Sequence, residues 1–394
     1  MSTPRIDDVD AFYFRMPTVL DIGDGSQDLL LVRVRSGTDT GWGECEASPL
    51  TTLAAMVTPM SHSACHPVLD SVLGHPLRGV ADITAVSAAV RARSADLLQA
   101  DHAVSGIEIA LWDLLGRREQ TPVWSLLGYA GALPRIPYAS ALFANTPAET
   151  AVKARTIRAA GFRAAKFGWG PFGTMDVAAD EAQVRAAREG LGADVELLVD
   201  AGTVFAEDVE AAAARLPVLA ECRVGWFEEP FVNGALAAHR ELAARSPAVP
   251  LAGGEGSHTA VQAEALVESG AVGFIQVDTG RIGGIGPSAR VAAHAHDRGV
   301  RYVNHTFTTR LALAASLQPH AGLVGHDLCE FPVEASPLAR ALTGPALEPA
   351  ADGTTQLTDK PGLGIDIDLD SIRPYLVDTE ITVAGRLLYQ TPQL

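Results

Sequence analysis

The chain has 394 residues, of which 47% are hydrophobic, and a formal net charge of −17 at pH 7. This length allows two or three domains, or one large barrel with an added domain, and the composition supplies a substantial core. The negative charge repels nucleic acid and anionic membrane surfaces, so we expect no polyanionic partner. A small anionic substrate is still compatible with this net negative charge if a metal ion or a few cationic side chains lie at its binding site.

The sequence has no sign of a disulfide framework or of a targeting segment. Its four cysteines are scattered without paired spacing, which also argues against a zinc site. The N-terminus lacks the basic segment and apolar run of a secretory signal, and no apolar run approaches the roughly 18 residues that cross a bilayer. We therefore expect a cytoplasmic protein with no membrane partner.

The first part of the chain is predicted to form a small α+β domain at residues 1–131. Alternating runs at 10–16 and 29–36 indicate β-strands. The Gly- and Asp-rich stretch between them, 17–28, indicates a loop that either closes over a ligand or merely connects a hairpin. Helical spacing of apolar residues over 103–118 then indicates a long amphipathic helix.

From residue 132 onward, short apolar runs alternate with Ala-rich helical stretches. This alternation favours βα units and a parallel sheet. Eight such runs in about 200 residues fit a (β/α) barrel better than an open, doubly wound sheet. We place the barrel at residues 132–355 and expect the turn-rich remainder, 356–394, to pack back on the first domain.

Seven polar residues recur near the ends of the predicted barrel strands, 23 to 34 residues apart: Lys166, Asp200, Glu228, Glu255, Asp278, His305 and Glu330. Each interval is about one βα unit, and the active sites of (β/α) barrels lie at the carboxyl ends of the strands. Taken singly, Asp200, Glu228 and Glu255 are each more often solvated loop acids. Taken together, the seven side chains are expected to meet in one mouth.

Asp200, Glu228 and Glu255 are three carboxylates on three successive predicted strands. Burying them unpaired would cost several kcal/mol each, and a divalent cation removes that cost. Ligation by oxygen alone favours Mg²⁺ or Mn²⁺ over zinc. Glu229 is left out of the ligand set because the next residue along a strand points the other way, or toward a neighbouring cation.

Asp278 and His305 fall on adjacent predicted strands. A carboxylate behind an imidazole fixes its tautomer and raises its basicity, as a general acid or base requires. Lys166 is expected to bind a substrate carboxylate, to pair with the metal ligands, or both. Glu330 is expected to lie across the mouth from the pair.

The glycine run at 278–286 lies far from the first strand and is not a proper dinucleotide-binding motif. We interpret Gly283 and Gly284 as a tight βα turn and Arg281 as a local salt-bridge partner.

These motifs together resemble the enolase superfamily, in particular the mandelate racemase/muconate lactonizing enzyme family and its mandelate racemase subgroup. The resemblance spans nearly the whole chain and includes GWGE at 41–44, SGIEIALWDLLG at 105–116, FRAAKF at 162–167, VDAG at 199–202, WFEEP at 226–230, AGGEG at 252–256 and PGLG at 361–364. It implies a modified TIM barrel, (β/α)7β, with an N-terminal α+β capping domain that the C-terminal segment completes.

The resemblance also implies a chemistry. Mg²⁺ would bind Asp200, Glu228 and Glu255 and stabilise an enediolate made by removing the proton next to a substrate carboxylate. Glu330 would hydrogen-bond that enediolate. By the same resemblance we expect a homo-oligomer.

The sequence departs from racemase-like members at two positions. The second lysine of their Lys-x-Lys motif is replaced by Gly168, and the third barrel strand ends in Gly202, where a second acid or an amide can stand. Only one strong acid/base pair, His305 with Asp278, then remains. A racemase needs a base on each face of the substrate carbon, and one is missing.

A β-elimination can use His305 twice, first to remove the α-proton and then to protonate the departing β-hydroxyl on the same side. The sequence therefore favours a Mg²⁺-dependent hydro-lyase that dehydrates an acid sugar, an aldonate or aldarate, to a 2-keto-3-deoxy acid. Water or Lys166 is the alternative base. Two other readings stay open: a racemase, epimerase or cycloisomerase on the same scaffold, and a non-catalytic barrel with a structural metal.

Overall fold

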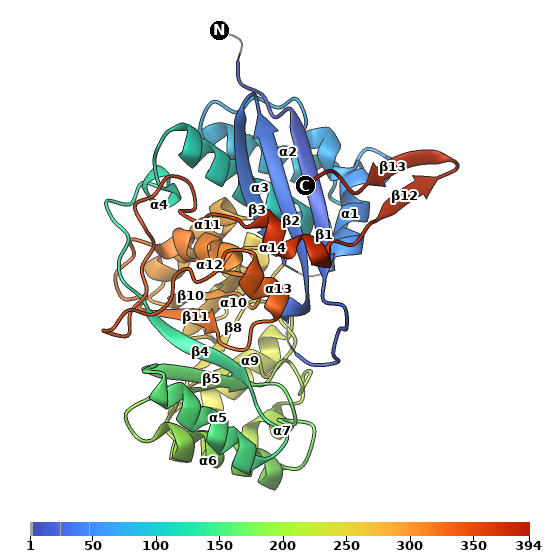
Figure 1. The fold of residues 1–394 in the computed structure, drawn as a ribbon. Helices are drawn as coiled ribbons and strands as arrows, with labels where there is room; N and C mark the ends of the chain where they lie inside the picture. Colours follow the sequence, from blue (N-terminus) through green and yellow to red (C-terminus); the bar gives the residue numbers. More distant parts are fainter. Residues whose placement is uncertain (1–2, 24, 47) are drawn as a thin grey trace.

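The computed structural model describes residues 3–23, 25–46 and 48–394. Figure 1 shows a three-stranded sheet with its helices at one end of the molecule and an α/β barrel at the other. The architecture is the one expected from the sequence, a modified TIM barrel with an N-terminal capping domain. No described helix is long and apolar enough to cross a membrane.

The capping sheet is antiparallel and contains β1 (Asp8–Arg15), β2 (Asp28–Ser36) and β3 (Asp39–Cys45), in that order. Its helices are α1 (Pro49–Val57), α2 (Val80–Arg93), α3 (Ala100–Arg118) and α4 (Val123–Leu126). Glycines allow α3 to lie directly on β3, because a Cβ on Gly43 would collide with the carbonyl oxygen of Gly106. This close approach explains the small residues of the GWGE and SGIE motifs.

Eight parallel strands form the barrel: β4 (Ile136–Leu142), β5 (Ala164–Gly168), β6 (Glu196–Asp200), β7 (Val224–Glu228), β8 (Leu251–Gly253), β9 (Phe274–Asp278), β10 (Arg301–His305) and β11 (Leu328–Pro332). Strands β4 to β10 pair in chain order, and β11 pairs with β4. The ring closes between β10 and β11, where the backbone N–H of Glu330 donates to Asn304 Oδ1 at 3.0 Å.

The helices that cover the barrel are α5 (Pro147–Ala159), α6 (Val177–Leu191), α7 (Val209–Ala213), α8 (Leu216–Glu221), α9 (Leu236–Arg245), α10 (Ala260–Glu268), α11 (Ile285–Asp297) and α12 (Arg310–Leu317). Several of these helices begin at an N-cap residue whose side chain accepts a backbone hydrogen bond. Examples are Thr146, which forms a capping box with Glu149, and Thr309. The eighth strand is followed only by the short α13 (Pro337–Ala341).

Successive side chains along each barrel strand point alternately outward, toward the helices, and inward, toward the barrel interior. Outward side chains such as Val199 and Val277 pack under the helices. Inward side chains near the amino ends form a separate apolar floor of Tyr138, Ala164, Leu198, Trp226, Ala252, Phe274, Val303 and Leu328. Two positions further along five of these strands, the same face carries Lys166, Asp200, Glu228, His305 and Glu330. The floor therefore fixes the depth at which the candidate site begins.

Helix α3 joins the capping domain to the barrel. Ser105 Oγ accepts a hydrogen bond from the backbone N–H of Gly283 at 2.8 Å. The Glu108 carboxylate accepts those of Ile285 and Gly286, at 2.6 and 2.8 Å, and so caps α11 from the other domain. Gly283 has a φ of 103°, which confirms the tight turn expected of the glycine run.

The C-terminal segment contains α14 (Leu369–Ile372), β12 (Glu380–Val383) and β13 (Arg386–Gln390). It returns to β1, where the N–H of Val377 donates to the carbonyl of Tyr13 at 2.8 Å. The β12–β13 hairpin extends away from the body beside α1 (Figure 1), and Tyr389 Oη donates to the carbonyl of Ala11 at 2.7 Å.

Replacing Glu108 with alanine is expected to destabilise the protein by about 3 kcal/mol, because two buried N–H groups at the start of α11 lose their acceptor. Chemical unfolding followed by circular dichroism measures this loss. The control is Glu119→Ala at the exposed end of the same helix, which should change the free energy of unfolding by less than about 0.5 kcal/mol. Equal losses in the two variants would contradict the capping role of Glu108.

Candidate active site

The seven side chains predicted from the sequence lie together at the carboxyl end of the barrel, joined by one continuous set of close charge contacts. Lys166 lies at one side of this set. Its Nζ is 2.6 Å from Glu228 Oε1 and 2.8 Å from Glu330 Oε1. It is also 3.6 Å from Asp200 Oδ2. The lysine is therefore held by three strands other than its own.

His305 lies at the other side of the set. Its Nδ1 is 2.7 Å from Asp278 Oδ2, which fixes the ring as the sequence predicted. Its Nε2 is 3.0 Å from Glu255 Oε2 and 3.9 Å from Glu330 Oε2. Burial alone would lower the pKa of His305, but the surrounding carboxylates raise it to about 10.

Neutral donors fix the orientation of the acids as well. Trp226 Nε1 donates to Glu228 Oε2 at 2.8 Å, from the apolar floor directly below. The backbone N–H of Thr306 donates to Glu330 Oε2 at 2.8 Å. Each of these carboxylates is thus held by both a charged and a neutral group, which restricts it to one geometry.

The chemistry of the acids fits a hard divalent cation. Burial raises the pKa of Asp200 to about 6 and that of Glu228 to about 8, with Lys166 opposing the shift and neighbouring carboxylates adding to it. The described residues contain no group of acids, cysteines or imidazoles already arranged as a metal shell; Lys166 and His305 lie against the acids instead. The carboxylates of the buried Asp200 and Glu228 and of the partly buried Glu255, at or just after the ends of successive strands, nevertheless supply the oxygen ligands and negative charge that Mg²⁺ requires. Asp200, Glu228 and Glu255 are the residues that would hold it.

Glu229 does not point away from the site, the first of the two orientations expected; Arg281, a neighbouring cation as the second required, is among the charges that act on it. The strand ends at Glu228, and Glu229 takes a left-handed φ of 38°, so the alternation does not extend to it. Its Oε1 accepts the N–H of Gly256 at 3.4 Å, beside Glu255. Burial and the nearby carboxylates raise its pKa well above the usual range. Glu229 therefore adds to the crowding of acids.

The capping domain contributes a carboxylate that the sequence analysis did not assign. Glu46, just after β3, forms a two-point ion pair with Arg281 at 2.5 and 3.0 Å. Burial would raise the pKa of Glu46, but Arg281 lowers it to about 2. Arg281 also approaches Glu255 Oε1 at 3.5 Å, so it joins the two domains and is not the local partner expected. The feature of the sequence that could have identified Glu46 as a site residue was the pair of acids, Glu44 and Glu46, at the end of a predicted strand.

A cavity of about 70 Å³ opens between these charged residues and the capping domain. Gly23 and Gly25 line it from the segment between β1 and β2, Trp169 lines it after β5 and Phe307 after β10. The 17–28 loop, which the sequence analysis expected either to close over a ligand or merely to connect a hairpin, thus reaches the site through Gly23 and Gly25.

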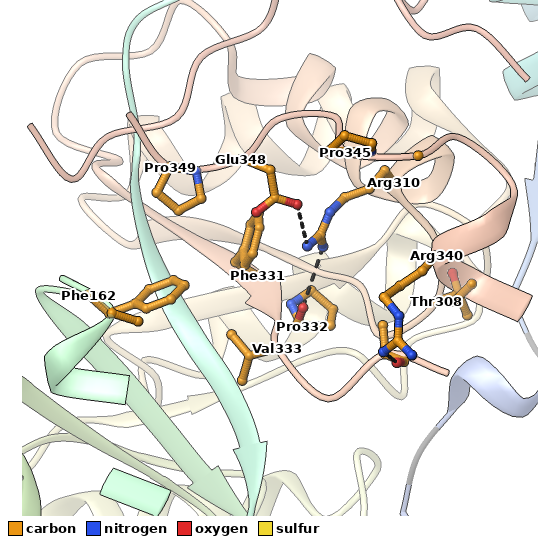
Figure 2. Close-up of a pocket in the computed structure, with 14 residues that line it drawn as sticks. Phe162, Thr308, Arg310, Phe331, Pro332, Val333, Arg340, Pro345, Glu348 and Pro349 are labelled. Atoms are coloured by element: carbon orange, nitrogen blue, oxygen red, sulfur yellow. Dashed lines mark hydrogen bonds and ion pairs between the residues drawn. The ribbon is translucent and has the colours of Figure 1, made fainter. Parts of the chain in front are cut away.

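A larger cavity, of about 580 Å³, lies elsewhere (Figure 2). It opens beside the outer face of β11, where no long eighth helix follows the strand. Arg310 lies 3.8 Å above the ring of Phe331 there and pairs with Glu348 at 3.3 Å. None of the seven predicted residues lines this cavity, so size does not identify the active site here.

Close packing explains why a second lysine is missing on β5. A Cβ on Gly168 would lie 2.7 Å from the Cβ of Asp200 and 3.0 Å from its Oδ2. Any side chain at this position would therefore displace a predicted metal ligand.

Two family models cover most of the chain. The model of the mandelate racemase/muconate lactonizing enzyme N-terminal domain matches residues 10–128, and the enolase C-terminal domain-like model matches residues 149–371. The chain belongs to the enolase superfamily. The matches confirm the family inferred from the motifs, with one model on each of the two domains.

Individual members of the enolase superfamily resemble the chain along most of its length. D-galactarolactone cycloisomerase of Agrobacterium fabrum is 31% identical, over 85% of this chain and 87% of that protein. D-galactonate dehydratase of Klebsiella pneumoniae is 29% identical, over 84% and 86%. The crystal structure of a protein from Rhodobacter sphaeroides, described as a predicted mandelate racemase, is 55% identical with a TM-score of 0.94, over 99% and 100% of the two chains.

Members of the enolase superfamily bind Mg²⁺. One similar crystal structure, of a racemase from Streptomyces coelicolor A3(2), contains bound magnesium; it is 25% identical with a TM-score of 0.78, over 94% of this chain and 100% of that one. This agrees with the oxygen-rich donor set of the present site.

Addition of Mg²⁺ to metal-free protein is expected to raise the melting temperature, because a ligand at about 100 times its Kd stabilises the folded state by about 2.7 kcal/mol. Asp200→Asn should abolish this response. Glu196→Gln, at the opposite end of the same strand, should keep it. Differential scanning calorimetry with and without Mg²⁺ makes the comparison, and an unchanged response in Asp200→Asn would remove this residue from the ligand set.

Proposed function

We propose that the chain is a Mg²⁺-dependent lyase that removes the proton next to the carboxylate of an acid sugar and eliminates the β-hydroxyl, giving a 2-keto-3-deoxy acid. The observation that carries the proposal is the buried pair of His305 and Asp278, whose Nδ1 and Oδ2 lie 2.7 Å apart. The close packing of Gly168 on Asp200 leaves no room for a second lysine at position 168 of β5. One base on one face suits a syn elimination better than a racemisation.

His305 has two tasks in this reaction. Its neutral Nε2 takes the α-proton, and the same nitrogen then returns a proton to the departing β-oxygen, so that the C–O bond breaks and water leaves. Bound Mg²⁺ would neutralise the acids that raise the pKa of His305 and would stabilise the negative charge of the enediolate. Asp278 keeps the imidazole in the required tautomer throughout.

Lys166 and Glu330 act as a unit in this proposal. Burial would raise the pKa of Glu330, but Lys166 and His305 lower it. The hydrogen bond to the enediolate that the resemblance implied for Glu330 stays a prediction. Glu330 holds the ammonium group of Lys166 at 2.8 Å. Lys166 is therefore the cation that faces the carboxylate of the substrate.

A cycloisomerase is the second candidate, favoured by the 31% identity to a galactarolactone cycloisomerase over most of the chain. The two reactions share the removal of the α-proton. They differ in the β-oxygen, which is a hydroxyl in a dehydratase but a ring oxygen in a lactone or cyclic ether. A ring oxygen stays attached to the product after the C–O bond breaks.

Incubation of the Mg²⁺-loaded protein with a panel of aldonic acids, aldaric acids and their lactones should yield a 2-keto acid that reacts with semicarbazide. Mass spectrometry then separates the two candidates. A dehydratase gives a product one water lighter than its substrate, and a cycloisomerase gives one of equal mass. If no acid or lactone in the panel turns over, both candidates fail.

His305→Asn is expected to lower kcat by at least about 10²-fold, the contribution typical of a general acid or base. His62→Asn, on the exposed surface of the capping domain, should retain full activity. The Mg²⁺-dependent rise in melting temperature of His305→Asn shows whether the site is intact. Retained turnover in His305→Asn would remove the pair from the mechanism.

A further inference from the structure

Trp169 occupies the rim of the site in a strained conformation. It follows β5 directly and has a φ of 53°, a left-handed backbone conformation that is unfavourable for a bulky residue. Its side chain is 45% exposed, so burial in the core does not account for the strain. Strain of this kind persists where the surrounding structure enforces it, and it concentrates at functional sites.

Two glycines from different domains enclose the indole. A Cβ on Gly23 of the capping domain would lie 3.0 Å from Cδ2 of Trp169. A Cβ on Gly202, after β6, would lie 2.9 Å from the same atom. Only residues without a side chain fit this closely on either side, so the indole is wedged between the capping domain and the barrel.

The backbone beneath the indole is fixed as well. A Cβ on Gly168 would contact Asp200, and one on Gly170 would lie 2.6 Å from the carbonyl oxygen of Phe143. The Gly-Trp-Gly segment is therefore pressed against two neighbouring strands or their loops. The backbone that carries Trp169 therefore cannot shift toward Asp200 or Phe143 without displacing them.

We propose that Trp169 is a specificity-determining residue of the proposed reaction. Its wedged indole is a rigid wall of the site and limits the size of the acid that fits between the metal-binding carboxylates and the capping domain. The cavity in front of it, of about 70 Å³, is small for a ligand site. The wall therefore selects compact acids, and rejects those with long chains beyond the β-carbon. This inference rests on the proposed function for the identity of the ligand.

Calorimetric binding of meso-tartrate and D-glucarate to the Mg²⁺-loaded protein tests the wall without requiring turnover. The wild type should bind the shorter tartrate more tightly. Trp169→Ala should shift the affinity ratio toward glucarate by about tenfold, within the range that hydrophobic pockets achieve. Trp169→Phe should restore part of the preference. An affinity ratio that stays the same in Trp169→Ala overturns the proposal.

A double-mutant cycle tests the wedge itself. Gly23 lacks a left-handed φ, so alanine fits its backbone, but the new Cβ presses on the indole. Gly23→Ala should therefore weaken tartrate binding in the wild type and have no effect in Trp169→Ala. Gly234→Ala, whose Cβ meets nothing within 4 Å, should be neutral in both. Additive effects of Gly23→Ala and Trp169→Ala overturn the wedge.

The two experiments separate this inference from the proposed reaction. If the ratio of tartrate to glucarate affinity shifts in Trp169→Ala while no acid turns over, the role of Trp169 as a wall of the site is supported and the lyase proposal is refuted. Turnover with an unshifted ratio refutes the wall and leaves the lyase in place.

Discussion

The burial of many carboxylates at one end of the barrel is the constraint on which the rest of the site depends. Acids from the barrel meet Glu44 and Glu46 of the capping domain there, and Lys166, Arg281 and His305 face this group. Such crowding is tolerable only if each acid has a cation or a donor. The constraint explains why the indole N–H of Trp226 donates to Glu228 and why Arg281 pairs with Glu46 of the capping domain and approaches Glu255 of the barrel. It also explains why this group of oxygen donors suits a divalent metal ion.

The sequence predicted the barrel and its seven polar residues because both follow from short-range regularities. Strand alternation places a functional residue two positions beyond the apolar floor, as with Trp226 and Glu228. The βα repeat then brings these residues to a common mouth. The roles of the seven residues remain predictions, since their positions show proximity and charge but not chemistry.

What the sequence did not predict depends on contacts between distant segments or on local backbone geometry. Glu46 and Arg281 are 235 residues apart, and no spacing rule links them. Glu229 faces the site because its backbone turns left-handed after the strand ends, which alternation does not anticipate. The sequence showed that Gly168 replaces the second lysine of the Lys-x-Lys motif. Only the structure shows that Asp200 occupies the space that a side chain at position 168 would need.

The return of the C-terminal segment to β1 has a consequence for the order of folding. The carbonyls of Ala11 and Tyr13 receive their donors from Tyr389 and Val377, and Gln393 accepts a hydrogen bond from Arg33. Strand β1 is thus bonded to residues that lie 364 and 378 positions further along the sequence. Contacts over so long a separation form slowly, because the whole intervening chain must be brought to order first. The contacts between the C-terminal segment and β1 therefore depend on the folding of the barrel that lies between them in the sequence.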